Sequence, residues 1–143
     1  LLEGLCESSD ARIAEIAQKC FKEVTYHVRR STDLMIRLGD GTEESHKRML
    51  AAIPDVWRFT VELLAADDSE QRLCEAGITP DIATVAAAWQ AKVNEIFASA
   101  TLPVPAAASF FYLNARKGLH TEHLGILLAE MQFLPRAYPD ATW

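Results

Sequence analysis

Glu23 and His27 are the pair of residues whose types and spacing best suit metal chemistry. They lie four apart in a run with helical periodicity, so they share one helix face. Carboxylate-bridged two-metal sites in helical bundles take a Glu-x-x-His from two helices and a single Glu from two others. Here the spacing is one residue longer, because Tyr26 stands three after Glu23. Two interpretations stay open, a pair of metal ligands or a buried histidine held by a carboxylate, and the spacing favours the second.

A second group of histidines and acids lies near the C-terminus. His120 and His123 are three apart, with Glu122 between them and Glu130 further on. His123 and Glu130 would share a helix face, but seven residues at about 1.5 Å each separate them by roughly 10 Å. That distance is too long for a single ion. Capping by Thr121 and a favourable interaction of Glu122 with the helix dipole explain the group better.

Other carboxylates add little to a metal site. Glu43 and His46 form the one Glu-x-x-His in the sequence, but they fall in a first helical turn after a glycine loop, where charge is usually solvated. Glu62 and Glu95 lie off the apolar stripes of their predicted helices. The count of inward-facing ligands therefore predicts that this chain alone does not assemble a two-metal site.

Two adjacent basic pairs are the remaining candidates for ligand binding. Arg29 with Arg30 and Arg116 with Lys117 could bind a phosphate, although a solvated face or a salt bridge is the simpler interpretation. We find no glycine-rich phosphate loop and no serine in a nucleophile elbow.

The elements that position these residues are predicted to be helices. Apolar residues recur at steps of three and four, and no stretch alternates with period two. Asp10 and its neighbours should cap a helix over about 11–38, and Thr42 should cap the next, which Pro54 should kink or split. Further helices are expected from Asp67 to Gly77, from Thr79-Pro80-Asp81 onward, and from Thr121 to about Leu134, ended by Pro135.

Length and composition restrict the class of protein. The chain has 143 residues, half of them hydrophobic, and a net charge of −6. These values fit a single domain over 1–143, and the negative charge argues against a nucleic-acid binder. No apolar run approaches the length needed to span a bilayer. Three scattered cysteines without CxxC spacing fit buried thiols in a reducing cytoplasm.

The predicted helices form an incomplete bundle. The apolar stripe of the helix over 11–38 needs more partners than the other helices supply, and the first seven residues look like the end of a helix. We therefore expect missing N-terminal helices, a partner chain, or both. An exposed half-bundle face is a large apolar patch, which favours self-association.

Several segments resemble one known family over essentially the whole chain. The resemblance is greatest near the C-terminus, in the run from Lys117 through His120, Glu122 and His123, then Glu130, and finally Trp143. It extends to Lys22-Glu23 with Tyr26-His27, the turn over 37–42, and the Trp57-Arg58-Phe59-Thr60 run. The sequence resembles the C subunits of bacterial phenylacetyl-CoA epoxidases (phenylacetate-CoA oxygenases), in their C-terminal portion.

The resemblance implies an all-α, ferritin-like helical bundle. It also implies a multicomponent oxygenase that epoxidises the ring of phenylacetyl-CoA with dioxygen and electrons from a reductase. The di-iron centre would belong to the catalytic A subunit, and this chain would carry no cofactor, no catalytic residue and no metal ligand, and would contact phenylacetyl-CoA only indirectly. Glu23 and His27 would be a vestigial polar pair on the former metal face, and the C-terminal residues a structural or interface signature. A subunit with its own di-iron site is the alternative.

Overall fold

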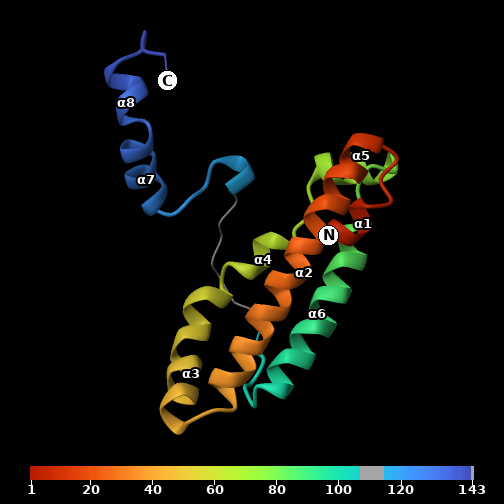
Figure 1. Ribbon diagram of the computed structural model, residues 1–143, viewed down its shortest axis with the longest axis vertical. Helices are drawn as coiled ribbons and strands as arrows, with labels where there is room; N and C mark the ends of the chain where they lie inside the picture. The colour runs from red at the N-terminus through yellow and green to blue at the C-terminus, as the bar shows by residue number, and fades with distance from the viewer. Residues whose placement is uncertain (107–114, 143) are drawn as a thin grey trace. The chain divides into compact units, whose positions relative to one another are not determined.

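The computed structural model describes residues 1–106 and 115–142, and they are organised into helices in two units (Figure 1). The first unit runs from Leu1 to Ser109 and the second from Phe110 to Trp143. No β-strand occurs within the described ranges, so the prediction of an all-α chain is confirmed. The single-domain expectation stays a prediction, and each unit is described here by itself.

Over residues 1–106, the first unit contains six helices. The longest is α2, which lies between α3 and α6 in Figure 1. The bounds are α1 (Leu2–Leu5), α2 (Ala11–Gly39), α3 (Glu43–Trp57), α4 (Thr60–Leu63), α5 (Asp68–Glu75) and α6 (Ile82–Ser99).

Side-chain caps begin the long helices at the places that the sequence predicts. The Asp10 carboxylate accepts from the backbone N–H groups of Arg12 and Ile13, at 2.9 and 3.1 Å. Thr42 forms a reciprocal capping box with Ser45. Each cap satisfies backbone donors that the first helical turn cannot pair internally. The prediction that α2 starts at Ala11 is therefore confirmed, and its end at Gly39 lies one residue beyond the expected one.

Pro54 lies inside α3, and the helical run predicted to continue past it is split three residues later, after Trp57. Helix α3 ends at Trp57, with Arg58 as its C-cap, and α4 begins at Thr60. Ile53 is buried, and the Trp57 ring packs against Phe97 with centroids 5.5 Å apart. These contacts lie on either side of Pro54 along one helix, and they offset the backbone hydrogen bond that proline removes.

Three other helix boundaries differ from the sequence predictions. Helix α6 is capped by Asp81, whose carboxylate accepts from the Ala83 N–H at 3.1 Å, and not by Thr79. In the second unit, α7 (His123–Met131) starts after Glu122, without a side-chain cap, and not at Thr121. Pro135 lies in the first turn of α8 (Phe133–Ala137), where a missing N–H costs nothing, so it does not end the helical segment.

The core of the first unit lies where the C-terminal ends of α2 and α6 meet α3. Four buried residues form it, and partly buried side chains from the three helices surround them. Trp57 contacts both Trp89, at 5.7 Å between centroids, and Phe97. The buried residues are Ile53, Phe97, Ala100 and Leu102, and their neighbours are Met35, Ile36, Met49, Trp57 and Val93.

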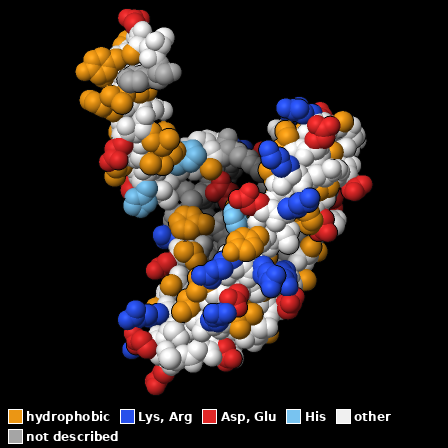
Figure 2. Space-filling model, viewed as in Figure 1, with side chains coloured by type: hydrophobic (Ala, Val, Ile, Leu, Met, Phe, Trp, Pro, Cys, Tyr) orange, Lys and Arg blue, Asp and Glu red, His pale blue; other side chains and the backbone are white. Residues whose placement is uncertain are grey.

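The second unit contains a short 3₁₀ helix, η1 (Ala115–Lys117), followed by α7 and α8. Neither α7 nor α8 contains a buried residue. Helix α7 is strongly apolar, and its side chains are still largely exposed, with Ile126 at 63% and Met131 at 67%. Hydrophobic side chains cover much of the α7–α8 segment in Figure 2.

Candidate functional site

Glu23 and His27 lie together on α2, as their spacing predicts. The His27 Nε2 and the Glu23 Oε1 are 3.8 Å apart. Both side chains are exposed, His27 at 63% and Glu23 at 77%. Within the described residues, the buried histidine expected from the sequence is therefore not formed, because no element of the first unit covers this part of α2.

His27 lies in line with exposed apolar residues of α2, although Glu23, Arg30 and Ser31 are among its neighbours on that face. Steps of three and four place it on the same side of α2 as a row of exposed apolar residues, with Glu23 at the edge of that row. We call these residues the exposed stripe of α2: Ile16, Cys20, Val24, Leu34 and Leu38. This exposure agrees with the expectation that the stripe needs more partners than the other helices supply, and the buried residues of α2 are Ala17 and Gly39.

The C-terminal histidines and acids do not converge on one point. His123 Nε2 lies 3.9 Å from Glu122 Oε1, and both side chains are at least 80% exposed. Lys117, His120 and Glu130 are also exposed. Trp143 lies outside the described residues. The role of these residues as a structural or interface signature stays a prediction.

His46 makes a structural contact at the turn between α2 and α3. Its Nδ1 lies 2.6 Å from the carbonyl oxygen of Gly39, so Nδ1 must carry the proton and donate it. Glu43 lies in the first turn of α3, where a negative charge is favoured by the helix dipole. His46 therefore fastens the α2–α3 turn, whereas Thr42 and Ser45 cap α3.

The remaining carboxylates do not complete a metal site. Glu95 binds the Lys92 Nζ at 2.9 Å through both oxygens. Over 1–106 and 115–142, no three His, Cys, Asp or Glu side chains gather closely enough to hold a metal ion. The described residues thus supply two separate Glu–His pairs, Glu23 with His27 and Glu122 with His123, where a two-metal site needs several carboxylates and two histidines in one place. They do not fit a di-iron centre by themselves.

The three cysteines form no disulfide bond. Cys6 and Cys74 are half-buried, and Cys20 is exposed on α2. The prediction of buried thiols is therefore wrong for Cys20, which belongs to the exposed stripe of α2.

A basic groove along α2 is a feature that sequence reasoning found only in part. Its volume is ≈ 840 Å³, and four cationic side chains line it. Arg29, Arg30 and Arg37 come from α2, and Lys92 comes from α6. Lys and Arg side chains gather over this region of the first unit in Figure 2. The adjacent Arg29 and Arg30 could be recognised in the sequence as a possible phosphate-binding pair. Lys92 lies far from them in the sequence and joins them only through the fold.

None of the helices in the described ranges has the length and apolar character required to cross a membrane.

Two comparisons with known proteins agree on the family of this chain. The chain is 46% identical over its 143 residues to the C subunit of the 1,2-phenylacetyl-CoA epoxidase of Escherichia coli (strain K12), and spans 57% of the length of that relative. Residues 1–143 match the family described as phenylacetic acid catabolic protein. The resemblance stated from the sequence motifs is confirmed, and with it the all-α, ferritin-like fold class. The chain therefore belongs to the phenylacetic acid catabolic protein family.

Proposed function

We propose that the chain is part of a non-catalytic structural subunit of a cytoplasmic, multicomponent di-iron oxygenase. The oxygenase epoxidises the ring of phenylacetyl-CoA in phenylacetate degradation, and this subunit packs against the catalytic subunit and stabilises it. The chain is similar to the C subunit of an epoxidase, which supports the proposal, and it spans 57% of the length of that subunit.

The exposed apolar surface is the structural observation that carries the proposal. Val24, Leu34 and Leu38 on α2 are 37–44% exposed, and the α7–α8 segment exposes Ile126, Met131 and several neighbours still further. Burying a large aliphatic side chain fully contributes about 1.5–3 kcal/mol. Contiguous apolar faces of this kind mark interaction surfaces in soluble proteins. The rest of the subunit and the catalytic subunit are the natural occupants of these faces.

The ligand count supports the non-catalytic part of the proposal. The described chain contributes Glu23 and His27 and no third ligand close to them. The di-iron centre accordingly belongs to the partner, the catalytic subunit. Glu23 and His27 remain as a polar pair within an apolar stripe, where the partner face covers them in the assembled protein.

The alternative is a subunit with its own di-iron site. The contact between Glu23 and His27 favours it, because both are iron ligands by type and the remaining part of the full-length protein would add others. The two functions differ in their iron content when the subunit is purified alone.

Recovery of the tagged full-length subunit from its native cells, grown on phenylacetate, tests the proposal. We expect a di-iron oxygenase chain to be recovered with it in a fixed ratio, identified by mass. Recovery of the subunit alone, with stoichiometric iron bound, would contradict the proposal and support the alternative.

A further inference from the structure

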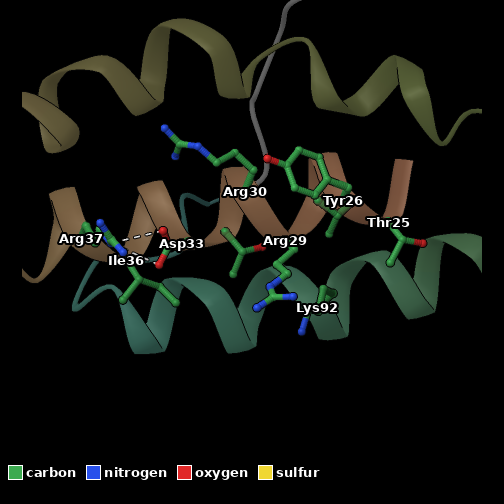
Figure 3. Close-up of a pocket in the computed structure, with 10 residues that line it drawn as sticks. Thr25, Tyr26, Arg29, Arg30, Asp33, Ile36, Arg37 and Lys92 are labelled. Atoms are coloured by element: carbon green, nitrogen blue, oxygen red, sulfur yellow. Dashed lines mark hydrogen bonds and ion pairs between the residues drawn. The ribbon is translucent and has the colours of Figure 1, made fainter. Parts of the chain in front are cut away.

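The basic groove contains two arginines that no acid of the described chain neutralises. Arg29 and Arg30 make no hydrogen bond or ion pair within the described ranges. Figure 3 shows Arg29 pointing toward α6 and Lys92, whereas Arg30 and Tyr26 point toward the other side of α2. Arg29 and Arg30 thus extend from α2 in different directions, and both line the groove.

The other two cations of the groove are partly occupied. Arg37 donates from Nε to Asp33 at 3.2 Å, which leaves the two terminal guanidinium nitrogens available. Lys92 is bound to Glu95 but remains 50% exposed. Arg37 therefore adds donors to those of Arg29 and Arg30, and Lys92 adds mainly positive charge.

The groove concentrates positive charge on an acidic chain. Four of the fourteen Lys and Arg residues line it, against one of the twenty Asp and Glu residues. Such segregation creates a local positive potential that attracts anions to this face and repels cations. Arginine is well suited to phosphate, since its planar fork donates two parallel hydrogen bonds.

The shape of the groove suits an extended anion better than a single small ion. Its volume of ≈ 840 Å³ lies within the range of small-molecule sites. The cations are distributed along more than two turns of α2, from Arg29 to Arg37, and do not converge on one point. Tyr26 is 65% exposed at the lining and offers an aromatic face for a base to stack on.

We infer that this groove binds the phosphate-bearing nucleotide end of a coenzyme A thioester. That end carries a pyrophosphate and a 3′-phosphate on adenosine, which together match several separated cations beside an aromatic ring. The inference rests on the proposed function, since it assigns this chain a direct contact with the substrate of the oxygenase. It differs from the sequence-based expectation that the chain meets phenylacetyl-CoA only indirectly.

Isothermal titration calorimetry on the full-length subunit tests the inference. The probes are coenzyme A, adenosine 3′,5′-bisphosphate, pantetheine and inorganic phosphate at one ionic strength. We expect the first two to bind saturably, pantetheine not to bind, and inorganic phosphate to bind more weakly. Arg29→Gln and Arg30→Gln should each weaken the binding of the bisphosphate about tenfold, the effect of losing one charge-assisted hydrogen bond.

Arg12→Gln is the matched control. Arg12 is exposed in the first turn of the same helix and lies outside the groove, so this variant should bind like the wild type. Circular dichroism of all three variants should be unchanged, because the substituted side chains are exposed. Raising the salt concentration should weaken binding by the wild type, and should have a smaller effect on a variant that combines Arg29→Gln with Arg30→Gln.

Three results would overturn the inference. The first is a bisphosphate that binds no tighter than inorganic phosphate. The second is equal binding by the groove variants and the Arg12 control. The third is a wild-type subunit that does not bind coenzyme A, together with groove variants that lose the catalytic subunit. The last result would make the groove a protein interface. Co-purification of the wild-type subunit with the catalytic subunit, measured in parallel, tests the proposed function separately, so the two failures are distinguishable.

Discussion

Gly39 and Ala100 lie in contact at the C-terminal ends of α2 and α6, with no space for a β carbon on Gly39. An added methyl group there would collide with the carbonyl oxygen of Ala100 and approach its side chain and that of Leu102 to 2.9 Å. The carbonyl oxygen of Gly39 also accepts from His46 and Thr101, at 2.6 and 3.3 Å. One glycine thus joins the end of α2 to the start of α3 and to the end of α6.

Gly39→Ala should destabilise the protein by about 1–3 kcal/mol, the usual cost of inserting a methyl group into a close-packed contact. Urea unfolding of the full-length subunit measures it. Gly125→Ala is the control, since its added methyl group meets no atom of the described residues within 4 Å and Ala is the better helix former. Equal effects of the two substitutions would contradict the close contact.

His46→Ala should lower the free energy of unfolding by about 0.5–1.5 kcal/mol, the net value of one hydrogen bond. The loss comes from the bond between Nδ1 and the Gly39 carbonyl, which fastens the α2–α3 turn. His123→Ala removes an 80% exposed histidine and should leave the unfolding curve unchanged. If the His46 variant instead lost bound metal without losing stability, the structural role assigned to His46 would be wrong.

Phe97→Leu should destabilise the first unit by about 1–2 kcal/mol, because Phe97 is 5% exposed and packs edge-on against Trp57. Phe133→Leu changes a 64% exposed ring and should stay within about 0.5 kcal/mol of the wild type in the described chain. Tryptophan fluorescence during unfolding follows both variants, since Trp57 and Trp89 lie in the same cluster. A Phe97 variant as stable as the Phe133 variant would place the core elsewhere.

Val24→Asn tests whether the exposed stripe of α2 is covered in the full-length subunit. Val24 is 39% exposed in the described chain, beside His27. If the rest of the protein covers it, an unpaired polar group there should cost about 1–3 kcal/mol. Lys19→Asn, on the same helix and exposed, should stay within about 0.5 kcal/mol of the wild type. Equal effects of the two variants would mean that the stripe stays in water.

Much of the helical organisation could be predicted from local sequence signals. Asp10, Thr42 and Asp67 each cap a helix where a short polar residue precedes an apolar period. These interactions involve residues within three positions, so the sequence contains all that determines them. The exact position of the break after Pro54 could not be predicted in this way, since the burial of Ile53 and the packing of Trp57 depend on α6, which lies far away in the sequence.

The candidate sites could be predicted only as far as they are local. The contact between Glu23 and His27 follows from helical spacing, and the structure contains it. Its exposure does not follow, because periodicity shows which residues share a face and not what covers that face. In the groove, Arg29 and Arg30 are adjacent in the sequence, but Lys92 joins them only through the packing of α6 on α2.

Iron content of the purified full-length subunit tests the central claim most directly. The subunit should be expressed alone in iron-replete cells, as the wild type and as the Glu23→Gln, His27→Gln double variant. The proposed structural role predicts no stoichiometric iron in either protein, and iron only after the catalytic subunit is added. Stoichiometric iron in the wild type, lost in the double variant, would contradict it and make Glu23 and His27 metal ligands.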